Sequence, residues 1–255
     1  MEQIKTAIIL ISFGTSNEKV RNLTIDKLAT EISATFPNFE LRQAYTSNFI
    51  IKKLLQRGIK ISNVDEQIAN LRAEGFDKII LLSTHLTAGE EFDSKIKIHA
   101  ADDVKVLSPI FSDDLRKISE IILKCYPITD EDLILIGHGS PNRHNPVYEN
   151  FQRLIDENYQ HIHVGVIEES DTPNFNHVVE RLKNRNVKKI LLAPLLFNGG
   201  MHVEKDIKIF WRDKFINLGY DVKVCGDCLG TFKNFRELYL QKISQEYLRK
   251  EIDEN

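Results

Sequence analysis

Short apolar runs recur along the chain, and the stretches between them carry apolar residues at helical spacing. The runs cover residues 7–11, 78–82, 104–107, 133–136, 161–166, 189–193 and 222–224. Each is bounded by glycine, proline or polar residues, which is typical of strands buried on both faces. Residues 64–76 and 175–183 have the pattern of amphipathic helices, and Thr172 and Pro173 are expected to begin the second one as its cap and first residue. This alternation predicts an α/β fold in which parallel sheets carry helices on both faces.

Two parts of the chain resemble each other. Residues 8–15 and 133–140 both run from a strand into a glycine turn, and their match sets Phe13 opposite His138. The run from Lys78 matches the run from Lys189 without a gap, which sets Glu91 opposite His202. Strand–helix units can look alike without common origin, but a match through helix, strand and turn favours duplication. We therefore expect two α/β halves, 1–126 and 127–255, with a helix at 232–249 that packs back on the first half.

The composition of the chain argues against several classes of function. The chain has 255 residues, of which 42% are hydrophobic, so it can bury a substantial core. Its net charge of −3 gives no basic surface for nucleic acid or an anionic membrane. No run approaches the ~18 apolar residues of a membrane span, and no secretory signal pattern begins the chain. A cytoplasmic protein without nucleic-acid or membrane partners is expected.

Three cysteines do not form a disulfide framework in a chain of this length. Cys225 and Cys228 make a CxxC motif, but it follows the last predicted strand instead of opening a helix after the first. Inert thiols are therefore the preferred interpretation for all three, with redox or metal handling as the alternative. The chain has no GxGxxG after a strand, no phosphate-binding P-loop and no GxSxG motif, so no organic cofactor is expected.

The candidate chemistry lies at strand ends, where open parallel sheets bind their ligands. His138 and His202 both follow strands in glycine-rich turns, as do Phe13, His85 and Glu91. If the halves face one another across a cleft, these side chains converge there. Two imidazoles and a carboxylate can hold a divalent transition metal with an open coordination face, and they can also accept protons near neutral pH. For a single histidine, the simpler alternative is a ring that only satisfies backbone hydrogen bonds.

The motifs form an ordered set from residue 7 to about residue 230. They are Ser12-Phe13-Gly14-Thr15-Ser16; Ala44-Tyr45-Thr46-Ser47 with Ile50-Ile51-Lys52-Lys53-Leu54; His85 with Gly89-Glu90-Glu91-Phe92; Gly137-His138-Gly139; and Gly200-Met201-His202. This set resembles the class II tetrapyrrole chelatases, most closely the cobalt-inserting branch of anaerobic cobalamin biosynthesis. The chain departs from the family pattern at Met201, where relatives carry an acidic residue.

The resemblance implies two flavodoxin-like halves with the active-site cleft between them. It implies insertion of Co2+ into sirohydrochlorin, or its precursor form, without ATP. His138 and His202 would be the metal-binding and proton-accepting residues, with Glu91 as their acidic partner. Alternatives that keep this scaffold are insertion of Fe2+ or Ni2+, and a non-catalytic carrier of a tetrapyrrole or metal. The sequence is also compatible with a homo-oligomer.

Substrate contacts are expected from the strand-end turns. The residues concerned are Phe13, Gly14, Thr15, His85, Gly139 and Ser140. The backbone N–H groups after Phe13 and Gly139 are expected to meet peripheral carboxylates of the tetrapyrrole, with arginine or lysine side chains near the rim.

Overall fold

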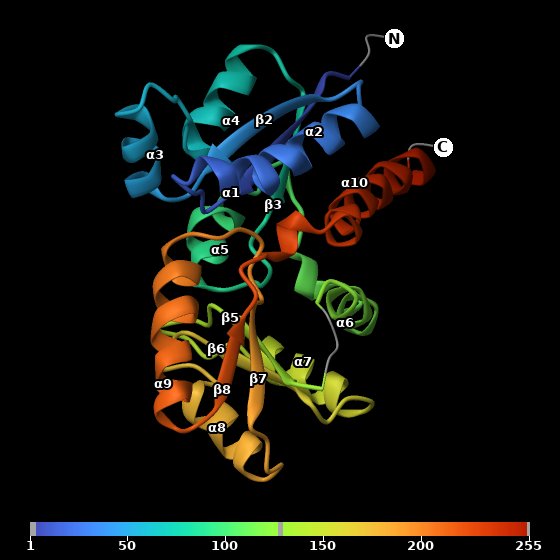
Figure 1. Ribbon diagram of the computed structural model, residues 1–255. Helices are drawn as coiled ribbons and strands as arrows, with labels where there is room; N and C mark the ends of the chain where they lie inside the picture. The colour runs from blue at the N-terminus through green and yellow to red at the C-terminus, as the bar shows by residue number, and fades with distance from the viewer. Residues whose placement is uncertain (1–3, 127–129, 254–255) are drawn as a thin grey trace. The chain divides into compact units, whose positions relative to one another are not determined.

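The computed structural model describes residues 4–126 and 130–253. The chain forms two compact units, Met1–Ile110 with Phe232–Asn255 and Phe111–Thr231. Each unit is built around its own four-stranded, fully parallel sheet, so the predicted α/β class with two similar halves is confirmed (Figure 1). No helix among the described residues is long and apolar enough to cross a membrane.

The sheet of the first unit has the strand order β2-β1-β3-β4. Its strands are β1 (Thr6–Ser12), β2 (Glu40–Tyr45), β3 (Lys78–Ser83) and β4 (Val104–Val106). In the register, Ile11 lies beside Ala44 of β2 and Ser83 of β3. The carboxyl ends of three strands therefore meet at one edge of the sheet.

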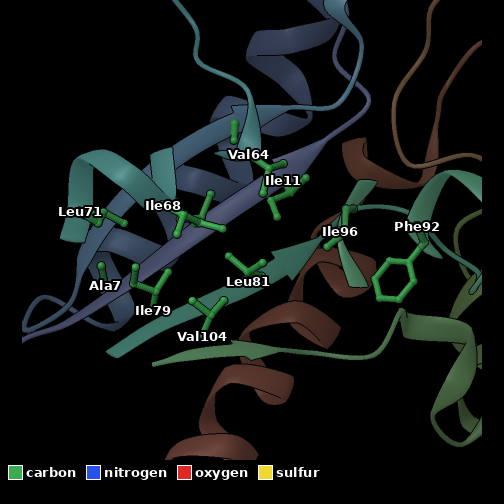
Figure 2. Packing of buried hydrophobic residues seen from close by; sticks show 12 residues of the cluster. Ala7, Ile11, Val64, Ile68, Leu71, Ile79, Leu81, Phe92, Ile96 and Val104 are labelled. Atoms are coloured by element: carbon green, nitrogen blue, oxygen red, sulfur yellow. The ribbon is translucent and has the colours of Figure 1, made fainter. Parts of the chain in front are cut away.

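Helices cover both faces of this sheet. They are α1 (Glu18–Leu23), α2 (Ile25–Thr35), α3 (Asn48–Leu55), α4 (Val64–Ala73), α5 (Glu90–Lys95) and α10 (Lys233–Asp253), with a 3-10 turn at Lys97–His99. A further 3-10 turn, Ile110–Ser112, spans the point where the two units divide. On one face, Ile68 and Leu71 of α4 and Phe92 of α5 pack against β1 and β3 (Figure 2). Ile8 and Leu10, which alternate to the other face of β1, are equally buried.

The sheet of the second unit repeats the topology, with the order β6-β5-β7-β8. Its strands are β5 (Asp132–Gly137), β6 (Ile162–Val166), β7 (Lys189–Pro194) and β8 (Asp221–Val224). Its helices are α6 (Leu115–Leu123), α7 (Val147–Asp156), α8 (Phe175–Lys183), a π-helical segment (His202–Trp211), α9 (Arg212–Asn217) and a 3-10 turn (Leu229–Thr231). One core cluster joins α8, the π-helical segment and α9 to β5 and β7.

All seven predicted strands are present, and among the strands of residues 4–126 and 130–253 the sequence missed only β2. This strand lies at the sheet edge, and its first four residues are exposed or half-buried. It therefore lacks the continuous apolar run on which the strand prediction relied.

The predicted cap of α8 was wrong. Asn174 is the cap residue, and its Oδ1 accepts from the backbone N of Asn176 at 3.1 Å. Thr172 and Pro173 lie before the cap, and the hydroxyl of Thr172 donates instead to Glu149 at 2.7 Å. The asparagine takes the cap because its carbonyl oxygen reaches the first free N–H groups of the helix.

The units divide after Ile110, earlier than the expected boundary after residue 126. Helix α6 belongs to the second unit, where it contacts α7. Arg116 of α6 donates to both carboxylate oxygens of Glu157, at 2.6 and 3.0 Å. The last helix returns to the first unit, where Arg236 of α10 donates to both oxygens of Glu31 in α2 at 2.7 and 2.8 Å.

Candidate active site

His138 follows the last residue of β5. Its carbonyl accepts from Glu168 N at 3.0 Å, and the Gly137 carbonyl accepts from Ile167 N at 3.0 Å. Gly139 has a φ of +80°, a conformation in which residues with a Cβ are strained. The chain after β5 therefore stays hydrogen-bonded to the chain after β6 for two residues, and this fixes His138 at the carboxyl edge of the sheet.

His202 is the first residue of the π-helical segment, at the end of the loop that follows β7. The β7 strand pairs directly with β5, and Leu195 N donates to the Ile136 carbonyl at 2.7 Å just beyond the paired residues. The two histidine-bearing loops therefore leave neighbouring strands at the same edge. Strand order brings together two residues that are far apart in sequence.

The two imidazole rings face each other. The Nε2 atoms of His138 and His202 are 3.3 Å apart, and the ring centroids are 4.5 Å apart at an interplanar angle of 82°. Both side chains are about 40% exposed, at 39% and 41%. The structure thus joins two of the three residues predicted to handle the metal, and one side of the pair remains open to solvent.

The other nitrogen of each ring has an acceptor as its partner. Nδ1 of His138 lies 3.1 Å from the Gly139 carbonyl oxygen, and Nδ1 of His202 lies 2.8 Å from Oδ2 of Asp206. Since neither oxygen carries a hydrogen in its ordinary state, both neutral rings are assigned the Nδ1–H tautomer. Each Nε2 then presents a lone pair toward the other. Two facing lone pairs repel unless a cation or a proton lies between them.

The spacing of the pair fits a single metal ion. With metal–nitrogen distances of about 2.0–2.1 Å, a nitrogen separation of 3.3 Å corresponds to a ligand–metal–ligand angle of roughly 105–110°. That angle is close to tetrahedral. Neutral imidazole nitrogens are good ligands for first-row divalent metals, so the pair supplies two coordination positions and leaves the others open.

The first unit contains the same hydrogen-bond pattern without the histidines. Thr84 N donates to Ile11 O at 2.8 Å, which corresponds to the bond from Leu195 N to Ile136 O in the second unit. Thr46 N donates to Ser12 O at 2.9 Å, which corresponds to the bond from Ile167 N to Gly137 O. Ser47 N donates to Phe13 O at 3.3 Å, which corresponds to the bond from Glu168 N to His138 O. Gly14 has a φ of +96°, matching Gly139. Phe13 therefore occupies the position of His138, as the sequence match predicted.

Phe13 and its neighbours form the turn after β1. The Phe13 side chain is exposed. A Cβ at Gly14 would lie 2.4 Å from the Tyr45 ring, so this position needs glycine for space as well as for its φ. Thr15 is buried, and its hydroxyl accepts from Asn17 N at 3.3 Å.

The two turn amides expected to meet substrate carboxylates are already engaged within the protein. Gly14 N donates to Ser12 Oγ at 3.1 Å, and Ser140 N donates to Asp171 Oδ2 at 2.9 Å. In this conformation neither N–H is available to a ligand. The acceptor of the Gly14 amide is local, whereas that of the Ser140 amide comes from a residue 31 positions away in the sequence.

Asp171 holds the loop that contains His138. This carboxylate is fully buried and accepts from the backbone N of Ser140, Asn145 and Thr172 at 2.9, 3.1 and 2.8 Å. Nδ1 of His144 lies 2.9 Å from Asp171 Oδ1, and this contact raises the pKa of His144. Its ring is half exposed but anchored.

His85 and Glu91 lie in the first unit. His85 follows β3, and its Nδ1 is 2.8 Å from Ser83 Oγ, which also accepts from the His85 backbone N at 3.0 Å. Glu91 is the second residue of α5 and is half-buried. Among the described residues, its carboxylate has no hydrogen-bond or ion-pair partner, and it therefore keeps its acceptor capacity for a ligand.

Two acidic residues beside the histidine pair were not predicted. Asp206 binds His202, and Oε1 of Glu168 lies 3.9 Å from Nδ1 of His138. The spacing of Asp206 four residues after His202 could have indicated the first. Glu168 comes from the loop after β6, and no sequence signal links it to His138. Within the described part of either unit, no three His, Cys, Asp or Glu side chains form a set able to hold a metal.

The cysteines are free thiols. Burial raises the pKa of Cys225 and raises that of Cys228 to about 12. A thiol that is not ionised near neutral pH is a poor nucleophile and a poor metal ligand. Neither Cys225 nor Cys228 is therefore activated as a thiolate.

Two solved structures of the protein SirB share this fold. A structure of SirB from Bacillus subtilis with Fe3+ aligns with a TM-score of 0.62 at 14% identity, over 94% of this chain and 95% of that one. SirB from Bacillus subtilis subspecies spizizenii in complex with cobalt aligns with a TM-score of 0.56 at 13% identity, over 94% of each chain. The fold is thus that of the chelatase class.

Sequence comparison is more specific. The family profile described as Cobalt chelatase (CbiK) matches residues 6–247, and the chain belongs to this family of enzymes. A sirohydrochlorin cobaltochelatase of Salmonella typhimurium is 23% identical over 95% of this chain and 96% of that protein. Sirohydrochlorin cobaltochelatase CbiKC of Nitratidesulfovibrio vulgaris is 25% identical over 80% of this chain and 75% of that protein.

Proposed function

We propose that the protein inserts Co2+ into sirohydrochlorin, or its precursor form, without ATP. The single observation that carries this proposal is the His138–His202 pair, with Nε2 atoms 3.3 Å apart and both rings half exposed. Membership of the cobalt chelatase family and the names of its relatives support the choice of metal and macrocycle.

In the proposed reaction the two imidazoles first bind the metal and then accept the two protons that the macrocycle releases. Co2+ binds the Nε2 lone pairs of His138 and His202, and its open coordination positions receive nitrogens of the tetrapyrrole. As the metal moves to the macrocycle, the macrocycle loses two N–H protons. Each Nε2 that releases the metal regains a lone pair, so the two imidazoles can accept the two protons. None of these reaction steps requires ATP or a redox cofactor.

Glu91 is proposed as the acidic partner of this reaction, because its half-buried carboxylate keeps its acceptor capacity. The turn residues are proposed as substrate contacts through surfaces other than the engaged amides. Phe13 offers an exposed aromatic face, which suits a flat macrocycle. His85, Gly14, Thr15, Gly139 and Ser140 complete this set of proposed contacts.

The direct test is an insertion assay with purified protein, sirohydrochlorin and Co2+, followed by absorption spectroscopy. Many equivalents of Co-sirohydrochlorin per protein are expected. A carrier would stop at one equivalent, and that result would refute catalysis. Parallel assays with Fe2+ and Ni2+ decide the metal, since histidine ligands do not separate these ions by themselves.

The ligand assignment is tested by His138→Ala and His202→Ala. Each variant should lose at least about a hundredfold in insertion rate while its melting temperature stays within about 2 °C of the parent, since half-exposed strand-end side chains contribute little to the core. His177→Ala is the matched control, because His177 is an exposed histidine of the same unit on α8. Unfolding of both site variants, or full activity of either, would contradict the assignment.

A further inference from the structure

We infer that Asp206 is the positioning residue of His202. Its carboxylate holds the imidazole so that the Nε2 lone pair faces His138 and meets the incoming divalent metal. This inference rests on the proposed function, because it gives His202 the role of a metal ligand.

The contact is short and specific. Oδ2 of Asp206 lies 2.8 Å from Nδ1 of His202, four residues away in the π-helical segment. A helix closed by i→i+5 hydrogen bonds has more than four residues per turn, so residues four and five apart share one side. Within the described chain, this is the only hydrogen bond or ion pair that the Asp206 side chain makes. In the described part of the chain, the contacts of this carboxylate therefore indicate no function other than orienting His202.

The two histidines differ in how they are held. The His138 ring is oriented by the backbone carbonyl of Gly139, which is part of its own loop. The His202 ring is 41% exposed and has only a side chain, Asp206, to fix its Nδ1–H. Without that acceptor, the ring can rotate or exchange to the Nε2–H tautomer, which has no lone pair at the metal-facing nitrogen. Carboxylates that orient metal-binding imidazoles in this way typically change metal affinity 10–100-fold.

A purely structural role predicts a different outcome. The Asp206 side chain is 34% exposed, and an exposed i,i+4 ion pair adds little to stability. Asp206→Ala should therefore shift the melting temperature by at most about 2 °C. A change in tautomer or in metal affinity would not follow from so small a stability effect.

The experiment uses the full chain with 15N-labelled histidine and Co2+ alone as the probe. Two-bond 1H–15N spectra of the metal-free protein report the tautomer of His202, whose signals are assigned by their loss in His202→Ala. Titration with Co2+ then gives the affinity. The variants are Asp206→Ala and Asp206→Asn, which keeps an oxygen acceptor. The matched control is Glu204→Gln, since Glu204 lies on the same segment and pairs with Lys208 at 2.7 Å.

The parent and Glu204→Gln should show the Nδ1–H tautomer and equal Co2+ affinity. Asp206→Ala should show Nε2–H and bind Co2+ about 10–100-fold more weakly, with a smaller loss for Asp206→Asn. The inference is overturned if Asp206→Ala keeps the parent tautomer and an affinity within twofold of Glu204→Gln. If His202→Ala inserts Co2+ normally, the ligand assignment fails as well. If His202→Ala is inactive but Asp206→Ala matches the control, only the role of Asp206 fails.

Discussion

Replacing Gly137 with alanine tests how closely the end of β5 is packed against α7. A Cβ at this position would lie 2.4 Å from Cε1 of Tyr148, and 3.0 and 3.1 Å from Cζ and the hydroxyl oxygen. Tyr148 is itself buried, at 3% exposure, so its ring has little room to retreat. The backbone of Gly137 is not in the left-handed region, and the cost of the substitution is therefore steric.

The size of the effect follows from two opposing contributions. Forcing a methyl group into a packed core costs about 1–3 kcal/mol. Alanine also restricts the unfolded chain, which offsets about 0.4–1 kcal/mol. A net loss of about 1–2 kcal/mol remains, and for a protein of this size it lowers the melting temperature by about 3–6 °C. Since His138 is the next residue, the displaced strand end should also weaken Co2+ binding by the imidazole pair.

Thermal unfolding followed by circular dichroism measures the stability, and Co2+ titration measures the site. Gly200→Ala is the control, because a Cβ there would meet no atom within 4 Å. In a Tyr148→Ala background the clash is absent, and Gly137→Ala should then cause no further loss. The reasoning is refuted if Gly137→Ala melts like Gly200→Ala, or if its cost is unchanged without the Tyr148 ring.

Three further perturbations probe the scaffold. Burial lowers the pKa of His163, so below about pH 6.5 the unfolded chain binds a proton at this residue more readily than the folded chain does. The free energy of unfolding should therefore fall as the pH drops below about 6.5. His163→Gln should weaken this pH dependence, measured as the midpoint of urea unfolding. Arg236→Ala removes the paired hydrogen bonds to Glu31 and should cost about 2 kcal/mol, seen as a lower melting temperature. Burial raises the pKa of Cys228 to about 12, so Cys228 should react with a thiol reagent at neutral pH only after unfolding. Peptide mapping distinguishes it from the partly exposed Cys225, and rapid modification of Cys228 itself in the native protein would contradict its burial.

The sequence alone was sufficient to predict much of the scaffold. Seven strands were recognised because each contains a short apolar run bounded by glycine, proline or polar residues. The same pattern is missing in β2, because polar side chains interrupt this strand and its first four residues are exposed or half-buried. The match of Phe13 with His138 also came from sequence, and the repeated backbone hydrogen bonds agree with it.

The site needed the tertiary structure. Sequence placed His138 and His202 at strand ends, but their 3.3 Å approach depends on the pairing of β5 with β7, which are not consecutive strands. The carboxylates that bind these two loops were not predicted from the sequence either. Asp171 accepts from the Ser140 amide although it lies in a turn far away in the sequence, and Asp206 selects the tautomer of His202. Local patterns determine which segments become strands and turns, because burial and backbone conformation act over a few residues. Which strand ends become neighbours is decided by hydrogen bonds and packing between segments far apart in the chain, and those contacts leave no periodic trace in the sequence.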